Sequence, residues 1–319
     1  MWESSWWTTS VAEPVAAVDC GSNSTRLLIT DPEGRAMARE MRITRLAEGV
    51  DASGELTDVA RARTLTVLEE YHGLCERAGV TRGLCAATSA VRDARNGAAF
   101  LARARETLGF DAVVLSGEDE AAYSFEGATL DLADEGRPVA ILDVGGGSTE
   151  IASRVDGRVV GYSMQIGCVR VTERALGPDP VDAEHAARAV AMIESALEGA
   201  AAAAPELFAL GPDLRLVGLA GTISTLAQLD AGLDHYDRAV VHHRRLRREA
   251  VGAWRDRLGS EPPATRLGFP GMVRGREDVI VAGLFVVDAV MARLGVDELL
   301  SSECDILDGI AGRLRSSFA

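Results

Sequence analysis

The sequence predicts an α/β protein with two domains. Two segments, residues 15–29 and 139–151, repeat one pattern: an apolar strand, an aspartate, a turn rich in glycine, serine and asparagine, and a second apolar run. Each copy is followed by alternating strand-like and helical stretches, as in doubly wound sheets. With 319 residues, the chain is also long enough to bury two cores.

The elements of the first half are predicted from local patterns. Apolar positions at helical spacing predict helices, and short apolar runs between turn residues predict strands. Ser116 is expected to cap a helix, because Asp119 follows it at capping-box spacing. The predicted order is strands over 15–30 and 35–48, a helix over 57–78, a strand over 84–88, a helix that opens within 87–92 and runs to about 108, a strand over 111–115, and a helix from 116.

The second copy of the repeat restarts this order. It is followed by a hairpin that turns at Gly157, a helix over 182–204, a strand over 214–219, a Gly/Thr turn over 220–225, a helix over 276–294, a strand over 299–302 and a helix over 305–316. The polar stretch near 125–136 predicts the domain boundary. We therefore expect a first domain over 1–125 and a second over 126–304, with 305–319 as a candidate addition to the first.

Composition excludes several classes of function. A formal net charge of −15 argues against nucleic acid and anionic membranes as partners. No apolar run reaches the roughly 18 residues of a membrane span, and the Trp-containing start, 1–10, lacks the features of a signal peptide. The five scattered cysteines have no disulfide or metal spacing, which favours a reducing cytoplasm. All 33 basic residues are arginine, so arginine, backbone N–H groups or a metal must neutralise any bound phosphate.

The repeated turn suits phosphate chemistry. Glycines let the backbone approach a phosphate closely, and successive N–H groups and hydroxyls then point into one concavity. The aspartate after each strand, Asp19 or Asp143, offers oxygen to a hard cation. One such turn is weak evidence, but two copies and a third Gly/Thr turn predict loops that hold a phosphate chain and its metal from both sides.

Three segments resemble the signatures of the exopolyphosphatase / guanosine pentaphosphate phosphatase family: Asp19–Ser24, Asp143–Glu150 and Gly218–Thr222. Residues 87–96, 116–121, 166–170 and 276–278 match as well, so the likeness covers nearly the whole chain from Val15. That family belongs to the sugar kinase, actin and Hsp70-like ATPase superfamily. The resemblance therefore implies two ribonuclease-H-like (actin-like ATPase) domains that flank an active-site cleft. The chain resembles the short, two-domain form of the family. This form favours short polyphosphate chains or guanosine pentaphosphate as substrates.

The resemblance also implies roles for matching residues. Glu120 matches the general base that activates water, Arg92 an arginine that contacts the terminal phosphate, and Glu150 a further acid that orients water or metal. Asp143 resembles the aspartate that binds Mg²⁺, for which Mn²⁺ is the alternative, and Asp19 is a second ligand, directly or through water. Substrate contacts are implied for Gly21, Ser22, Asn23, Ser24, Arg92, Gly145, Gly146, Gly147, Ser148, Thr149, Gly221 and Thr222.

Structural alternatives stay open for several of these residues. Glu120 also suits an exposed acid in the first turn of a helix, where the dipole favours it, and Glu150 suits a surface position at the start of a strand. Arg26 is either a second phosphate contact or a solvated side chain. The basic run 242–248 either binds a polyanion or forms a solvated helix face.

The expected activity is metal-assisted hydrolysis of the terminal phosphate of inorganic polyphosphate by direct attack of water. The alternative is a guanosine pentaphosphate 5'-phosphohydrolase. An ATP-using kinase of the same fold is less favoured because the chain has no sugar-binding signature, and a non-catalytic polyphosphate or nucleotide sensor is less favoured because Glu120, Asp143 and Glu150 are retained. We expect a cytoplasmic protein without nucleic-acid or membrane partners, and a homodimer is compatible with this assignment.

Overall fold

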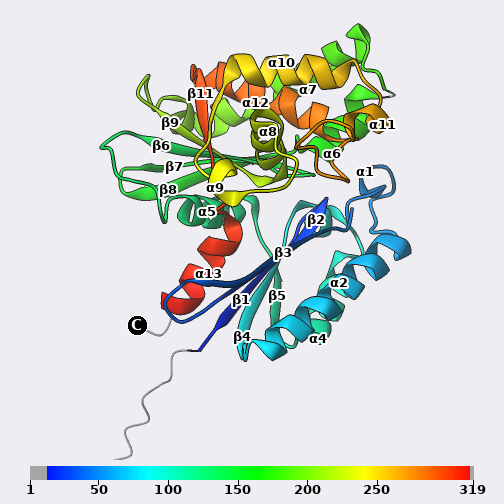
Figure 1. Ribbon diagram of the computed structural model, residues 1–319, viewed down its shortest axis with the longest axis vertical. Coiled ribbons are helices and arrows are strands. Elements are labelled where there is room, and N and C mark those ends of the chain that lie inside the picture. The colour runs from blue at the N-terminus through cyan, green and yellow to red at the C-terminus, as the bar shows by residue number, and fades with distance from the viewer. Residues whose placement is uncertain (1–12, 178, 317–319) are drawn as a thin grey trace, which may run out of the picture.

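The structure, a computed structural model, describes residues 13–177 and 179–316 and forms two α/β domains (Figure 1). The Trp-containing start lies outside the described residues. The first domain contains β1 (Val15–Cys20), β2 (Ser24–Thr30), β3 (Ala36–Ile43), α1 (Val50–Ser53), α2 (Asp58–Arg77), β4 (Arg82–Ala87), α3 (Ser89–Asp93), α4 (Gly97–Leu108) and β5 (Asp111–Val114). Helix α5 (Gly117–Ala128) follows and packs against the second sheet. Its sheet has the strand order β3-β2-β1-β4-β5.

The second domain repeats this plan with a larger sheet. Its elements are β6 (Val139–Val144), β7 (Thr149–Val155), β8 (Arg158–Met164), α6 (Cys168–Val171), the π-helical turn η1 (Thr172–Leu176), α7 (Ala183–Ala203), the 3₁₀ turn η2 (Pro205–Phe208), β9 (Arg215–Leu219), α8 (Ala220–Ala231), α9 (Arg238–Val241), β10 (Arg245–Arg247), α10 (Arg248–Gly259), α11 (Pro263–Arg266), α12 (Ile280–Leu294) and β11 (Glu298–Ser301). The strand order is β10-β11-β9-β6-β7-β8. These two mixed sheets confirm the predicted α/β class.

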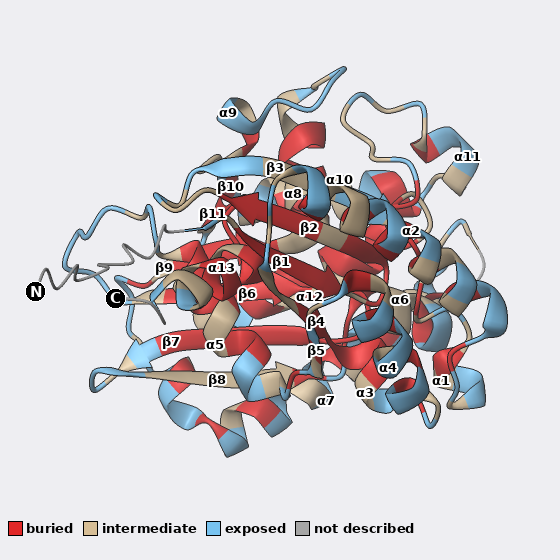
Figure 2. Ribbon diagram, turned by 90° about the horizontal axis from the view of Figure 1, so that it is seen from below, coloured by how far each residue is buried: buried red, intermediate tan, exposed pale blue. Residues whose placement is uncertain are grey.

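The same topology surrounds both glycine-rich loops. β1 pairs antiparallel with β2 and parallel with β4, and β6 pairs antiparallel with β7 and parallel with β9. The predicted strand over 15–30 is therefore a hairpin, because the loop at 21–23 reverses the chain. Buried side chains concentrate in these central strands (Figure 2).

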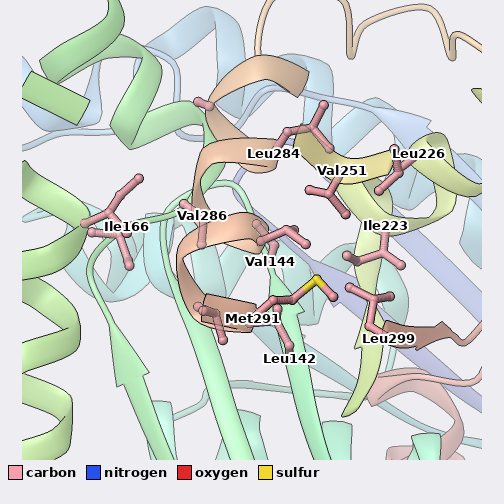
Figure 3. Packing of buried hydrophobic residues seen from close by; sticks show 14 of the residues in the cluster. Leu142, Val144, Ile166, Ile223, Leu226, Val251, Leu284, Val286, Met291 and Leu299 are labelled. Atoms are coloured by element: carbon pink, nitrogen blue, oxygen red, sulfur yellow. The ribbon is translucent and has the colours of Figure 1, made fainter. Parts of the chain in front are cut away.

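A dense apolar core supports the second loop. Leu142 and Val144 of β6 pack among side chains of α8, α10, α12 and β11 (Figure 3). In the labelled view the others are Ile166, Ile223, Leu226, Val251, Leu284, Val286, Met291 and Leu299. Since close packing resists displacement, this core fixes the end of β6, where Asp143 and the glycine turn follow.

The C-terminal helix α13 (Ile306–Ser316) lies against the first sheet (Figure 1). Its apolar side chains Ile306, Leu307, Ile310 and Ala311 share a buried cluster with Val15, Ala17 and Leu28. The chain passes from the first sheet to the second between β5 and α5, because Ala121, Phe125 and Ala128 of α5 share a buried cluster with β6, β7 and β9. It returns through 302–305. A boundary after residue 125 would cut α5, which continues to Ala128, so we propose 115–116 as the first crossing.

Helix prediction was wrong around 94–96. The expected single helix is two, α3 and α4, because Ala94 takes an extended conformation with ψ 131. The Asn96 side chain donates to the carbonyl of Leu56 and accepts from its N–H, both at 2.9 Å. At the break, the backbone N–H of Arg95 donates to the Gly54 carbonyl at 3.0 Å instead of to a helical carbonyl. No helix among the described residues is both long and apolar enough to cross a bilayer.

Candidate active site

The two glycine-rich loops face each other across a cavity of about 490 Å³ between the domains. A Cβ atom on Gly146 would lie 2.8 Å from the Ser22 side chain, and one on Gly147 would lie 2.5 Å from Ser89 Oγ. Glycine is therefore required for this approach. The predicted residues that line the cavity are Asp19, Gly21, Ser22, Asn23, Ser24, Glu120, Asp143, Gly145, Gly146, Gly147, Ser148 and Gly221.

Hairpin register gives each loop aspartate a partner seven residues later. Asp19 pairs with Arg26 in β1–β2, and Asp143 pairs with Glu150 in β6–β7. Directly opposed residues on antiparallel strands share a face of the sheet. The first copy of the repeat therefore neutralises its aspartate, while the second places two acids together.

Arg26 is neither solvated nor free to bind phosphate with its whole charge. Its Nε and Nη2 donate to Asp19 Oδ2 at 3.1 and 2.7 Å, and its Nη1 pairs with Asp305. The other oxygen of Asp19, Oδ1, is buried without a hydrogen-bond partner in the described structure. Asp19 can thus offer one oxygen to a metal or its water, but Arg26 already balances its charge.

Neither Asp143 nor Glu150 forms an ion pair of this kind within the described residues. Burial, partly offset by Arg26, raises the pKa of Asp143 to about 6, and burial together with the charge of Asp143 raises the pKa of Glu150 to about 8. Asp143 Oδ2 accepts from Ser124 Oγ at 2.8 Å, and Glu150 Oε1 accepts from Ser163 Oγ at 2.6 Å. Two buried acids with raised pKa values favour a bound cation, and oxygen donors suit a hard divalent metal.

Glu120 and Arg92 form an ion pair at the edge of the cavity. Arg92 Nη1 donates to Glu120 Oε2 at 3.1 Å and to the Leu115 carbonyl at 2.9 Å. Burial and the nearby Glu150 raise the pKa of Glu120 well above its usual range, and Arg92 opposes that rise. Glu120 is only 8% exposed. It is therefore a buried, perturbed carboxyl rather than the solvated acid of the structural alternative.

Unpaired polar atoms converge on the site. Within the described residues, Ser22 Oγ, Asn23 Nδ2, Arg92 Nη2 and Asp19 Oδ1 are all buried without a hydrogen-bond partner. Buried polar groups normally find partners, and leaving one unpaired costs about 1–3 kcal/mol. Three of these four atoms are donors, so an anion would satisfy them.

Arg276 is a site residue that sequence reasoning missed. Its guanidinium is buried, has no ion-pair partner in the described part of the chain and lies 3.5 Å from Ser24 Oγ. Burial lowers its pKa. A Cβ atom on Gly221 would lie 2.1 Å from Arg276 Cζ, so Gly221 makes room for this cation. The matching segment 276–278 was the available signal, but it indicated no role.

The side chains of two predicted substrate contacts, Thr149 and Thr222, are buried away from the cavity. Thr149 Oγ1 donates to the Ile166 carbonyl at 2.9 Å, and Thr222 is 1% exposed against Gly283 of α12. Neither residue lines the cavity, because each side chain is used in packing the second domain. Glu150 and Arg92 also lie outside the cavity lining. Each neighbours a residue that forms it, since Glu150 faces Asp143 and Arg92 pairs with Glu120.

The basic run 242–248 forms structural ion pairs. Residues 245–247 are strand β10, which pairs with β11. Arg244 pairs with Asp230 at 2.7 Å, Arg245 with Glu298 at 2.5 Å and Arg248 with Asp288 at 2.8 Å. Only Arg248 of the run belongs to a helix, so the interpretation as a solvated helix face was wrong. The run lies outside the cavity lining, and its binding of a polyanion stays a prediction.

A second cluster, Asp131, His242 and His243, has the residue types of a metal site. The backbone N–H of Glu303 donates to His242 Nδ1 at 3.0 Å. The proton of neutral His242 is therefore on Nε2, which donates to Asp131 Oδ2 at 2.9 Å. A metal would need a lone pair on that nitrogen, so this contact is a hydrogen bond.

The chain was compared with known proteins. The model of the "Ppx/GppA phosphatase family" matches residues 29–314. Exopolyphosphatase 2 of Mycobacterium tuberculosis is 40% identical over 314 residues, which cover 93% of this chain and 97% of that protein. The crystal structure of an exopolyphosphatase-like protein superimposes with a TM-score of 0.88 at 32% identity, covering 96% of this chain and 100% of the other.

A relative with a different printed activity is also similar. The guanosine-5'-triphosphate,3'-diphosphate pyrophosphatase of Vibrio atlanticus is 29% identical over 321 residues, which cover 97% of this chain and 61% of that protein. Relatives with both printed activities are therefore similar to nearly the whole of this chain, which covers only 61% of the Vibrio protein.

Proposed function

Because this chain belongs to the Ppx/GppA phosphatase family, we propose that its cleft hydrolyses the terminal phosphoanhydride bond of inorganic polyphosphate. The observation that carries the proposal is the set of unpaired donors in the first loop and beside the cavity. Ser22 Oγ, Asn23 Nδ2 and Arg92 Nη2 are buried and unsatisfied within the described residues, and a phosphate group would accept from all three.

The metal site is part of the proposal. Asp143 would hold a divalent cation, Mg²⁺ or Mn²⁺, with Glu150 beside it and Asp19 Oδ1 as a further donor. Such an ion supplies positive charge to the phosphate oxygens during transfer. The raised pKa values of Asp143 and Glu150 support this assignment, since neither acid forms an ion pair with a residue that the structure describes.

Glu120 is the proposed general base. Its carboxylate accepts a proton from water, the water oxygen attacks the terminal phosphorus, and the bond from phosphorus to the bridging oxygen breaks. The products are orthophosphate and a chain one unit shorter. A base works best when its pKa lies near the operating pH, and burial moves the pKa of Glu120 in that direction.

Cations and N–H groups stabilise the transferred phosphoryl group. Arg92 keeps one N–H on Glu120 and presents Nη2 to the substrate, so base and phosphate are held by one side chain. Arg276 adds a buried charge beside Ser24 that no described residue pairs with. Electrostatic stabilisation of this kind is the main protein contribution to phosphoryl transfer.

Phosphate release from polyphosphates of several lengths, guanosine pentaphosphate and ATP tests this function directly. We expect release from polyphosphate that requires a divalent metal and stops in chelator. Release only from guanosine pentaphosphate would select the alternative suggested by the Vibrio relative, and binding without release would indicate a sensor. The five free cysteines, all buried, support our proposal of a cytoplasmic location.

A further inference from the structure

Helix α6 holds the carbonyl groups of the second loop. The backbone N–H groups of Cys168, Val169 and Gly167 donate to the carbonyls of Gly145, Gly146 and Gly147 at 2.9, 2.9 and 3.1 Å. Arg170 Nε also donates to the Gly147 carbonyl, at 2.8 Å. The peptide bond is planar and trans, so a Gly147 carbonyl directed at α6 turns the Ser148 N–H to the opposite side, toward the cavity.

The other end of the Arg170 guanidinium reaches the first domain. Nη1 donates to Asp51 Oδ1 at 2.9 Å, and Nη2 donates to Ser89 Oγ at 3.3 Å and pairs with Asp93. The side chain is 13% exposed. Asp51 lies in α1, and Ser89 and Asp93 are the ends of α3, the helix that carries Arg92.

One half-buried side chain therefore connects a loop carbonyl of the second domain to two carboxylates of the first. We propose that Arg170 is a positioning residue that directs the Ser148 N–H at the substrate phosphate while Asp51 and Asp93 of the first domain hold its guanidinium. The inference rests on the proposed function, since that N–H belongs to the same cleft. Without Asp51 and Asp93, the guanidinium would have no fixed orientation, and the Gly147 peptide would lose one of its two donors.

Arg174 provides a matched control on the same helical segment. It also pairs with Asp51, but its side chain is 47% exposed and it makes no bond to the second loop. A change at Arg174 removes an interdomain ion pair while leaving the Gly147 carbonyl untouched. The comparison of the two arginines therefore separates loop positioning from simple attraction between domains.

The first test is steady-state hydrolysis of polyphosphate by R170K and R174K. Lysine keeps the positive charge near Asp51 and Asp93 but has no planar fork to reach Gly147 as well. We expect R170K to lower kcat by about 10- to 100-fold, as small misplacements of catalytic groups do, with KM changed less than threefold. R174K should stay within about twofold of the unmodified protein. Full kcat in R170K, or an equal loss in R174K, would overturn the proposal.

The second test does not depend on turnover. Hydrogen exchange of the loop amides at 145–149 is measured with inorganic phosphate and MgCl₂. We expect faster exchange in R170K than in R174K at matched thermal stability, and unchanged exchange in folded R170K contradicts the proposal. If R170K does not fold, D93N replaces it, with the same expected direction. Absence of polyphosphate hydrolysis by the unmodified protein would remove the proposed function, while the exchange result would still decide the role of Arg170.

Discussion

The two loop aspartates differ in the residue that faces each of them on the neighbouring strand, seven positions later in the sequence. Asp19 faces Arg26 and Asp143 faces Glu150, although the two segments otherwise repeat one pattern. Both aspartates were predicted from the sequence, which also contains the seven-residue spacing from Asp19 to Arg26 and from Asp143 to Glu150. What it did not show was the hairpin register, because register depends on where the loop ends. Arg276 was missed for a related reason, since only the folded chain brings it to Gly221.

The ion pair with Arg92 predicts a pH effect. Burial raises the pKa of Glu120 and Arg92 lowers it, so R92Q should raise that pKa further. A base acts only when ionised, and the acid limb of kcat/KM should therefore move to higher pH in R92Q. A pH–rate profile of the two proteins checks this. An acid limb that stays in place or moves to lower pH would show that Arg92 does not set the ionisation of Glu120.

Glu150 predicts an effect on stability without metal. Its pKa is about 8 in the folded protein and near 4.5 when unfolded, so folding loses stability as pH rises from about 4.5 to 8. E150Q should therefore raise Tm in chelator at pH 9 and give no such rise at pH 4. Each kcal/mol corresponds to roughly 2–4 °C in proteins of 150–250 residues. A Tm at pH 9 equal to or below that of the unmodified protein would contradict the raised pKa.

At the scale of elements, strands and long helices were the most predictable. α2, α5, α7 and α13 lie close to their predicted ranges because each has periodic apolar positions, and α5 also has the predicted Ser116 cap, which accepts from Asp119 N–H at 3.0 Å. The α3–α4 break and β10 were not predictable locally. The break accompanies a hydrogen bond between Asn96 and Leu56, which are far apart in sequence, and β10 forms only by pairing with β11.

A prediction at the scale of elements concerns Gly221, which lies at the start of α8. G221A would place a methyl group 2.1 Å from Arg276 Cζ and should displace that cation from the cleft. We expect kcat/KM to fall at least about tenfold, because the displaced guanidinium would no longer stabilise the transferred phosphate. G252A in α10 is the control, since its Cβ meets nothing within 4 Å. Equal kinetics in the two variants would remove Arg276 from the site.

At the scale of the molecule, two copies of one loop make a single site only because the domains face each other. The repeat predicted this arrangement, and the facing glycines Gly146 and Gly147 against Ser22 and Ser89 bear it out. The contacts that set the distance between domains, including Arg170 with Asp51 and Asp93, join residues far apart in sequence. No local pattern could indicate them.

The central claim is that this cleft activates water through Glu120, and kcat of E120Q tests it most directly. Glutamine keeps the size of the side chain but cannot accept the proton, so kcat on polyphosphate should fall by at least about 100-fold while KM changes little. E118Q, at an exposed position of the same helix turn, should retain kcat. Near-normal kcat in E120Q, above all beside a loss in E150Q, would contradict the account and move the base to Glu150.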